Sequence, residues 1–326
     1  MWWLLLLLGC GERTSRESGG AATRDSASTA PVWAPLEWSD CTELRDVGQL
    51  PRVDDEMVFR PAVLGDRIWF SMKGVEVPQS IGVADLVDPT TLAPAELLIQ
   101  GHQLGTTDAS SPAPVERPDG GIALFFDAWE GIQGLGIWRC DLDEAGQPET
   151  CARVVPQGSH GNLDAISAHI PSVHVDEEGT WRIWYTGMDP GELRRILTAT
   201  SEDGWTWSTP TLAVDLGSAG GWDDSSAYSP FVWRDATGWR LLYAGRSEHE
   251  GHLVKRLIEA RSDDGVIWTD HTMTLDLGCA GDWDAWRVDS PWVVPEGTGW
   301  RLYYDGFDDP VIEEGVRRLL TATASG

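Results

Sequence analysis

Two glutamates near the middle of the chain are candidates for proton transfer. Glu248 and Glu250 follow Arg246 in the segment RSEHE, directly after an apolar run that is typical of a strand. A carboxyl group in an aromatic-lined cavity is desolvated, so its pKa rises toward neutrality, as a general acid requires. The alternative is that both acids are solvated, because most Asp and Glu side chains are exposed. Glu248 is therefore a candidate catalytic acid, and Glu250 is a candidate substrate-binding residue.

Three arginines and one histidine have side chains that can hold a ligand. Arg60, Arg246 and Arg287 can bind a hydroxyl or a carboxylate by forked hydrogen bonds, or they pair with the many acids of the chain. His169 is either a satisfied core histidine or a side chain that faces the ligand. The cysteine spacings do not resemble a zinc site, and no loop carries a calcium motif. We therefore assign no metal and no cofactor, and leave a calcium ion in a central channel open.

These residues belong to a sequence repeat. A typical unit has a Ser-Pro-x-Val run, a Gly-Trp-Arg-x-x-Tyr run and a Ser-x-Asp-Gly-x-x-Trp turn. Short runs of Val, Ile, Trp, Tyr and Leu between Gly, Asp and Pro clusters indicate four antiparallel strands per unit, which is the blade of a β-propeller. The proline that marks each unit recurs after 51 to 61 residues, at Pro61, Pro112, Pro171, Pro230 and Pro291.

With five such units, residues 34–326 resemble the five-bladed propellers of the arabinanase, levansucrase and invertase superfamily. The resemblance rests on the Pro-x-Val starts, the Trp-Arg-x-x-Tyr-x-Gly second strands and the Ser-x-Asp-Gly turns. It implies an all-β, five-bladed β-propeller of four-stranded antiparallel blades, with a carbohydrate in the central funnel. It also implies hydrolysis by two acids, of which one protonates the leaving oxygen and the other acts as base or nucleophile.

Many hydrolases of this group carry the base as the aspartate of an Asp-Pro pair at the start of a blade. No unit has that pair here, but Asp289 is displaced from the position by one residue. Because side chains alternate along a strand, this shift turns Asp289 to the other face unless a bulge intervenes. Asp108 stands four residues before its marker proline, where no other unit has a carboxylate. The catalytic candidates are therefore Asp108, Glu248 and Asp289.

The funnel mouth of a propeller is lined by residues just before each marker proline and just after each second strand. Residues at these two kinds of position form the candidate substrate-binding set, which is Arg60, His169, Asp189, Tyr228, Arg246, Glu250, Arg287 and Asp305. An aspartate that recurs seven residues before the proline is interpreted instead as a structural cap on the loop that leads into the first strand of each unit. The Ser-x-Asp-Gly turns at Ser201 and Ser262 resemble the Asp-box turn of sialidases, and turn chemistry explains them without a catalytic role.

The fifth unit ends after its third strand, so its outer strand must come from elsewhere. The segment Ala34–Leu44 is strand-compatible, and we expect it to complete the fifth blade and close the ring, which removes exposed sheet edges. Cys140 and Cys151 bracket a turn-rich decapeptide and are expected to form a disulfide. The remaining pair, Cys41 and Cys279, would then tie the N-terminal segment to the last repeat.

The N-terminus has the features of a lipoprotein signal. The apolar run in MWWLLLLLGC is too short to span a bilayer, which needs about 20 residues. Leu7-Leu8-Gly9-Cys10 resembles the bacterial lipobox, which implies cleavage before Cys10 and acylation of that cysteine. Residues 1–10 are then the signal segment and 11–33 a flexible tether rich in Ser, Gly, Ala and Thr. We expect an extracytoplasmic protein that is lipid-anchored in the bacterial cell envelope, with the outer membrane as the expected site of the anchor.

The charge balance limits the partners. The chain carries 24 basic and 52 acidic residues, a net charge of −28, which repels nucleic acid and anionic lipid surfaces. We expect a monomer that contacts the membrane only through its lipid anchor. The leading hypothesis is a glycosidase-like propeller that binds a carbohydrate or glycan and hydrolyses it through the three candidate acids. The alternative is a non-catalytic propeller lipoprotein that recognises a glycan or a protein partner.

Overall fold

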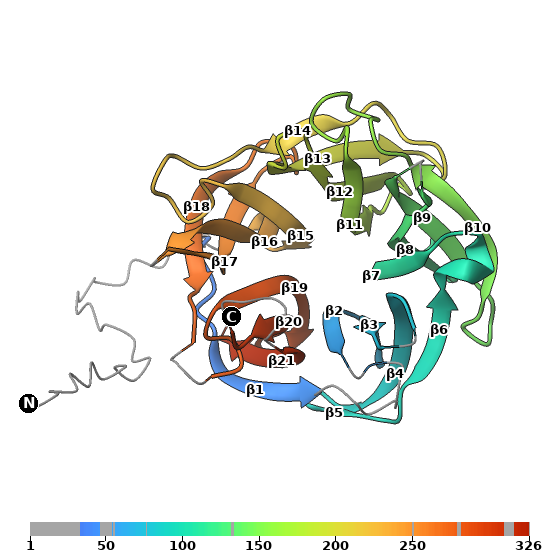
Figure 1. The fold of residues 1–326 in the computed structure, drawn as a ribbon, viewed down its shortest axis with the longest axis horizontal. Coiled ribbons are helices and arrows are strands. Elements are labelled where there is room, and N and C mark those ends of the chain that lie inside the picture. Colours follow the sequence, from blue (N-terminus) through green and yellow to red (C-terminus); the bar gives the residue numbers. More distant parts are fainter. Residues whose placement is uncertain are drawn as a thin grey trace, which may run out of the picture.

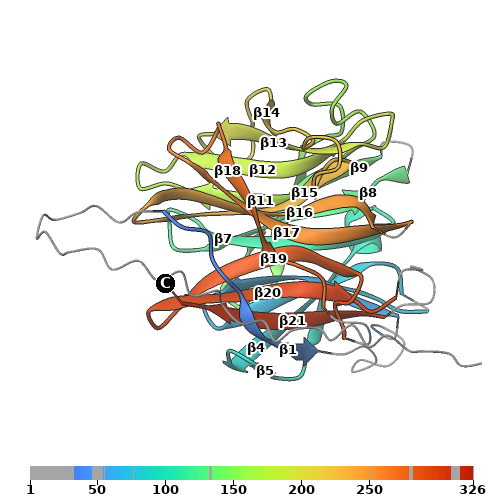
Figure 2. The ribbon, with the colours of Figure 1, turned by 90° about the vertical axis from the view of Figure 1, so that its left-hand side faces the viewer.

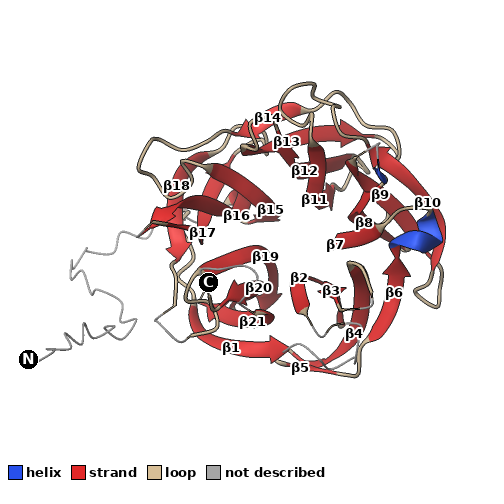
Figure 3. Ribbon diagram, viewed as in Figure 1, coloured by secondary structure: helices blue, strands red, loops and turns tan. Residues whose placement is uncertain are grey.

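The computed structural model describes residues 33–45, 54, 56–75, 77–131, 134–249, 251–278, 282–309 and 316–325. Strands dominate this part of the chain, and Figure 3 shows them around the whole circumference of a ring. A 3-10 helix, η1 (Gly101–Leu104), lies on the outer side. Among the described residues, no helix has the length and apolarity that a membrane crossing requires. The predicted all-β class is therefore confirmed.

Antiparallel pairing divides the strands into five groups of chain neighbours. The first comprises β2 (Met57–Leu64), β3 (Arg67–Lys73), β4 (Ser80–Asp88) and β6 (Glu96–Gln100), with β5 (Thr91–Leu92) beside β4. The second comprises β7 (Asp108–Glu116), β8 (Ile122–Trp129), β9 (Leu135–Leu142) and β10 (Pro148–Val155). The third comprises β11 (Ser167–Val175), β12 (Trp181–Met188), β13 (Arg194–Ser201) and β14 (Thr211–Val214).

The fourth group comprises β15 (Ser226–Asp235), β16 (Gly238–His249), β17 (His252–Ser262) and β18 (Thr269–Leu275). The fifth comprises β19 (Arg287–Glu296), β20 (Gly299–Phe307) and β21 (Arg317–Ala324), and β1 (Ser39–Arg45) pairs antiparallel with β21. In Figure 1 the first strand of each group, β2, β7, β11, β15 and β19, lies nearest to the centre. Figure 2 shows the same ring from its edge, with β15, β16 and β17 above β19, β20 and β21.

Each first strand has a bulge at its marker proline. The register between first and second strands shifts at the same place in all five groups, for example between Asp289 and Trp292. A bulge changes the direction of the side chains that follow, so simple alternation does not decide which way Asp289 points. The residue before each proline has a left-handed φ of 51° to 58°, and these residues are Arg60, Ser111, Ile170, Ser229 and Ser290.

The tryptophans of the repeat fill the space between neighbouring groups. Trp184 on β12 is fully buried and packs against Trp239 of the next group, with ring centroids 5.5 Å apart. Trp268 joins the same cluster at 6.4 Å from Trp184. Removing a buried aromatic side chain of this size costs about 3 to 5 kcal/mol. These three tryptophans therefore pack two adjacent strand groups together.

The aspartates that recur before the marker prolines hold loops in place. Asp164 accepts hydrogen bonds from the Tyr185 hydroxyl at 2.9 Å and from the His160 backbone N–H at 3.0 Å. The equivalent pairs, Tyr243 with Asp223 and Tyr304 with Asp284, are 2.7 and 2.9 Å apart. The structural interpretation of these acids is confirmed.

The Ser-x-Asp-Gly turns are also structural. Asp203 accepts the backbone N–H groups of Trp205 and Thr206, each at 2.8 Å, and the Gly204 N–H bonds Oγ of Ser201 at 2.8 Å. The turn that begins at Ser262 repeats this pattern. Each turn satisfies its own backbone donors, which is how an Asp-rich turn is stabilised.

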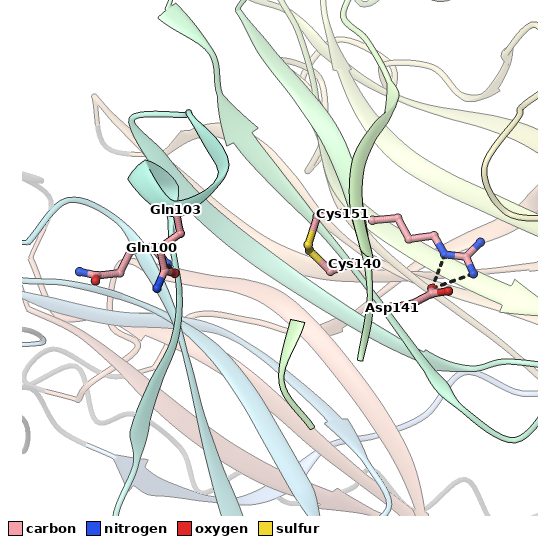
Figure 4. Close-up of a disulfide and its surroundings, with 6 residues drawn as sticks. Gln100, Gln103, Cys140, Asp141 and Cys151 are labelled. Carbon is pink, nitrogen blue, oxygen red and sulfur yellow. Dashed lines mark hydrogen bonds and ion pairs between the residues drawn. A yellow bond between two sulfur atoms is a disulfide. The ribbon is translucent and has the colours of Figure 1, made fainter. Parts of the chain in front are cut away.

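A disulfide joins β9 and β10 within the second group. Cys140 and Cys151 are paired across the two strands, as predicted, and Figure 4 shows the bond between them. The second predicted pairing involves Cys279, which lies outside the described residues. Cys10 and Glu250 lie outside them as well.

Candidate functional site

A cavity of about 250 Å³ lies near the ring axis, where several first strands begin. Its lining comes from β2, β11, β13, β15, β16, β17 and β19. The lining residues are Arg60, His169, Ile170, Arg194, Tyr228, Arg246, Leu253, Lys255 and Arg287. A narrow gap of about 20 Å³, lined by the five marker prolines and the residues before them, shares Arg60 and Ile170 with it. The cavity is therefore the wide end of a funnel whose narrow part is ringed by the bulges.

The lining is cationic. Five of its nine residues are Arg or Lys, and none of the described residues that line it is a carboxylate. The whole chain has more than twice as many acids as bases, so this concentration of positive charge runs against its composition. Such a local field attracts anions into the cavity.

Asp289 lies in the wall behind this lining, and its side chain is almost fully buried. Its Oδ2 is 2.5 Å from Nζ of Lys255 and 3.2 Å from a guanidinium nitrogen of Arg317. Its Oδ1 accepts hydrogen bonds from the Ser229 hydroxyl at 2.8 Å and the Ser290 backbone N–H at 2.7 Å. Burial alone would raise the pKa of Asp289, but the charges of Lys255 and Arg317 hold it well below its usual range. Asp289 is therefore ionised, with both oxygens engaged.

Asp305 and Asp127 each join one strand group to the next through the bulges. Oδ1 of Asp305 accepts the backbone N–H of Arg60 at 2.9 Å, and Oδ2 of Asp127 accepts that of Ile170 at 2.9 Å. Asp305 also lies 2.6 Å from Nε of Arg317. Burial raises the pKa of Asp305, and the charge of Arg317 opposes this increase. Both carboxylates satisfy a backbone donor that the left-handed bulge turns away from its own sheet.

Two cations of the lining have no carboxylate partner among the described residues. Arg194 donates only a 3.4 Å hydrogen bond, to the carbonyl oxygen of Glu192, and Nε of Arg246 is buried without a hydrogen-bond partner. Burial lowers the pKa of Arg194, and the charge of Arg246 lowers it further. These guanidinium groups thus repel each other in a partly desolvated place.

Burial and nearby charges also shift the pKa values of Lys255 and His169. Burial lowers the pKa of Lys255 to about 8, although the charge of Asp289 opposes the decrease. Burial, followed by the charges of Arg60 and Arg194, holds the pKa of His169 well below its usual value, so the imidazole is neutral. Its Nδ1 is 2.9 Å from the hydroxyl of Ser167, which leaves Nε2 for a contact elsewhere.

The structure brings together five of the eight residues predicted to bind substrate. Arg60, His169, Tyr228, Arg246 and Arg287 line the cavity. Of the others, Asp305 lies behind the wall, and Glu250 is outside the described residues. Asp189 caps its own loop by accepting the N–H groups of Gly191 and Leu193 at 2.8 and 3.1 Å, and forms an ion pair with Arg195 at 2.8 Å.

The three catalytic candidates do not line the cavity together. Asp289 is in its wall, whereas Glu248 is exposed near the end of β16. Asp108 is half-buried at the start of β7, where it accepts the backbone N–H of Trp129 at 3.3 Å. Burial raises the pKa of Asp108, and the charge of Asp127 adds to the increase. None of the described residues forms a group of three or more His, Cys, Asp or Glu side chains that could hold a metal ion.

Sequence reasoning missed Arg194, Lys255 and Arg317, although a signal exists. Each is the first member of a basic pair near the start of the third strand of its repeat. Successive side chains of a strand point to opposite faces, so one member of each pair turns toward the axis and the other away. The outward members form ion pairs with aspartates, as in Arg195 with Asp215, Arg256 with Asp276 and Arg318 with Asp308.

Comparison with known proteins places the fold but not the site. No protein-family profile matches the chain. The uncharacterized protein Rv1502 of Mycobacterium tuberculosis is 26% identical over 260 residues, which is 74% of this chain and 84% of that protein.

Solved structures with similar folds are glycan-active proteins. An N-acetylgalactosamine deacetylase from F. plautii in complex with blood group B trisaccharide is 13% identical, with a TM-score of 0.64 over 88% of this chain and 95% of that one. A thermostable family-43 glycoside hydrolase is 15% identical, with a TM-score of 0.62 over 85% and 90%. The catalytic domain of a GH62 α-L-arabinofuranosidase from Coprinopsis cinerea is 12% identical, with a TM-score of 0.64 over 89% and 97%. The chain thus has a glycoside hydrolase-like propeller fold.

Proposed function

We propose that this protein binds a carbohydrate in the cationic cavity and recognises it without hydrolysis. The observation that carries the proposal is the lining itself, which presents guanidinium, ammonium, imidazole and phenol groups and, among the described residues, no carboxylate. Such donors suit sugar hydroxyl groups, whereas glycoside cleavage needs two free carboxyl groups on either side of the bond. The fold likeness supports a carbohydrate ligand, since one similar structure holds a trisaccharide.

The size of the cavity limits what enters it. Pockets for drug-sized ligands have about 300 to 1,000 Å³, and this cavity has about 250 Å³. It therefore suits one sugar ring or one terminal residue of a longer glycan. Leu253, which is 48% exposed, supplies an apolar surface against which such a ring can rest.

A direct test uses the cavity rim. Leu253 is 48% exposed and lines the cavity, so Leu253→Trp fills the entrance without disturbing the core. Leu212→Trp is the matched control, because Leu212 is 38% exposed on the outer strand β14. The wild-type full chain should bind members of a glycan array, Leu253→Trp should lose this binding, and Leu212→Trp should keep it. Equal binding by both variants would place the ligand elsewhere.

Hydrolysis remains the second candidate function, because one acid has the property of a proton donor. Burial and the charge of Asp127 raise the pKa of Asp108, which is the direction that a general acid needs. Glu248 is the other candidate, as an exposed acid of β16. Aryl glycosides and oligosaccharides should be incubated with the wild type, Asp108→Asn and Glu248→Gln. Turnover that either variant abolishes would replace the binding proposal by hydrolysis.

The pairing of β1 with β21 supports a closed ring of five blades, which we include in the proposal. Ser39 pairs with Thr323 and Thr42 with Thr321, so the chain start supplies the fourth strand of the last group. The N–H of Leu36 donates a hydrogen bond to Glu259 at 2.8 Å, which fixes this segment to the fourth group as well. Deleting residues 34–45 should therefore abolish folding, as measured by loss of a cooperative thermal transition.

We further propose attachment to the bacterial cell envelope through a lipid on Cys10. The lipobox-like sequence supports it, and so does the disulfide between Cys140 and Cys151, since disulfides persist in oxidising compartments. In a Gram-negative host, the wild-type chain should fractionate with the outer membrane and Cys10→Ser should not. A Cys10→Ser protein that stays in the membrane fraction would contradict the anchor.

A further inference from the structure

We propose that the ligand of this cavity is an anionic carbohydrate, and that the group held at the cationic lining is a phosphate monoester. The inference rests on the proposed function, because it names the class of sugar that the same cavity binds. Its basis is the number of positive charges around the cavity and how few of them are neutralised by the protein.

The balance of charge leaves at least two cations for a ligand. Lys255 is neutralised by Asp289, and Arg60 lies 3.8 Å from Asp127. Arg194 and Arg246 form no ion pair with any carboxylate that the structure describes. They come from neighbouring strand groups, β13 and β16, and face the same cavity. A ligand with two negative charges would neutralise both.

The alternative explanation, that these arginines stabilise the fold, fails on energetic grounds. Both side chains are half-buried. Partly desolvated charges without partners are destabilising, and two like charges close together increase the cost. Arg240, a buried structural arginine, is neutralised by Asp235 and Glu259. Partly desolvated charges with shifted pKa values concentrate at functional sites.

A phosphate monoester fits this lining better than the other common anions of glycans. It carries a charge of about −1.5 to −2 at pH 7 and offers three acceptor oxygens. A uronate or a sulfate ester carries a single negative charge and would leave one cation unbalanced. A guanidinium group can donate two parallel hydrogen bonds to two phosphate oxygens, which suits Arg194 and Arg246. The ammonium group of Lys255 adds a point charge. The neutral His169 remains for a hydroxyl group of the ring, whereas the phenol of Tyr228 donates a hydrogen bond of 3.4 Å to Oδ2 of Asp289.

The experiment is isothermal titration calorimetry on the full chain at pH 7.5. The probes are glucose, galactose and mannose, their 6-phosphates and 6-sulfates, glucuronate and galacturonate, and inorganic phosphate. The variants are Arg246→Gln, Arg194→Gln and, as the matched control, Arg261→Gln, since Arg261 lies on β17 and pairs with Asp270 at the surface. At least one 6-phosphate should bind more than tenfold more tightly than its neutral parent. Arg246→Gln and Arg194→Gln should each remove about tenfold of that affinity, and Arg261→Gln should remove none.

The possible results separate this inference from the proposed function. Equal affinity for neutral and phosphorylated sugars would overturn the inference while supporting carbohydrate binding. Affinity for inorganic phosphate that no sugar phosphate exceeds would support the oxyanion site while overturning carbohydrate binding. Preference for a sulfate or a uronate over the phosphate would overturn the phosphate assignment. Absence of binding by every probe would overturn both proposals.

Discussion

The ammonium group of Lys255 lies 2.5 Å from Oδ2 of Asp289, inside the wall of the central cavity. This ion pair joins the fourth and fifth strand groups, because Lys255 is on β17 and Asp289 on β19. The carboxylate of Asp289 is thus surrounded by hydrogen-bond donors, and Arg317 lies 3.2 Å from the same oxygen. Lys255 and Arg317 therefore hold Asp289 ionised. Arg194 and Arg246 are the cations of the lining that this carboxylate does not neutralise, and we expect a ligand to contact them.

Removing the charge of Asp289 should destabilise the fold strongly. Asp289→Asn leaves Lys255 without its carboxylate partner, while Arg317 keeps only Asp305. Removing one partner of a buried ion pair costs about 3 to 5 kcal/mol. Asp215→Asn is the control, because Asp215 is mostly exposed and its pair with Arg195 is worth about 0 to 1 kcal/mol. Urea unfolding curves of both variants measure the difference. Similar midpoints for the two would show that the buried pair contributes little.

Replacing one unpaired arginine should stabilise the protein although it weakens ligand binding. Arg246→Gln removes repulsion from Arg194 and a buried donor that has no partner, so we expect a gain of about 1 kcal/mol. Arg240→Gln should have the opposite sign, because Arg240 is buried between Asp235 and Glu259. Thermal unfolding without ligand gives both values. A loss of stability in Arg246→Gln would mean that this side chain has a structural role.

Affinity for a phosphorylated ligand should fall as the pH rises through about 8. Burial lowers the pKa of Lys255 to this value, so its positive charge is present below pH 8 and lost above it. The groups that face it are Asp289 and Arg287 from β19, Arg317 from β21 and Tyr228 from β15. The tyrosine does not ionise in this range, because burial raises its pKa well above the usual value.

Titrations between pH 7 and 9.5 measure this effect, because the phosphate remains a dianion over that range. A loss of one charge-assisted contact corresponds to about tenfold in affinity. Lys255→Arg is the control, since arginine stays protonated, and its affinity should not change with pH. A wild-type affinity that is constant to pH 9.5 would assign no role to Lys255 in binding.

Loss of the disulfide should cost stability without affecting the cavity. Cys140 and Cys151 are 11 residues apart, and closing a loop of this size is worth about 2 to 3 kcal/mol in the chain-entropy model. The bond lies on β9 and β10, away from the residues that line the cavity. A Cys140→Ser/Cys151→Ser double variant should unfold at lower urea concentration and bind ligand as the wild type does. Weaker ligand binding by the double variant, under conditions in which it is fully folded, would show that this hairpin affects the cavity.

The sequence alone determined the repeat and the chemistry of its turns. The marker prolines, the tryptophans and the Ser-x-Asp-Gly turns recur at fixed places, and each acts through neighbours in its own or the adjacent blade. Local contacts of this kind follow from period and residue type, which is why the Cys140–Cys151 bond and the structural role of Asp164 were predictable.

The site was decided by tertiary structure. Arg194, Lys255 and Arg287 come from three strand groups, on β13, β17 and β19, and they line one cavity only in the folded chain. The left-handed bulge before each proline sets the direction of Asp289, and no pattern of alternation predicts it. Whether an arginine is neutralised depends on carboxylates far away in the chain, as the approach of Asp127 to Arg60 shows. Composition predicted an acidic protein, and only the folded ring places cations around its axis, because charge at a site depends on which side chains converge there.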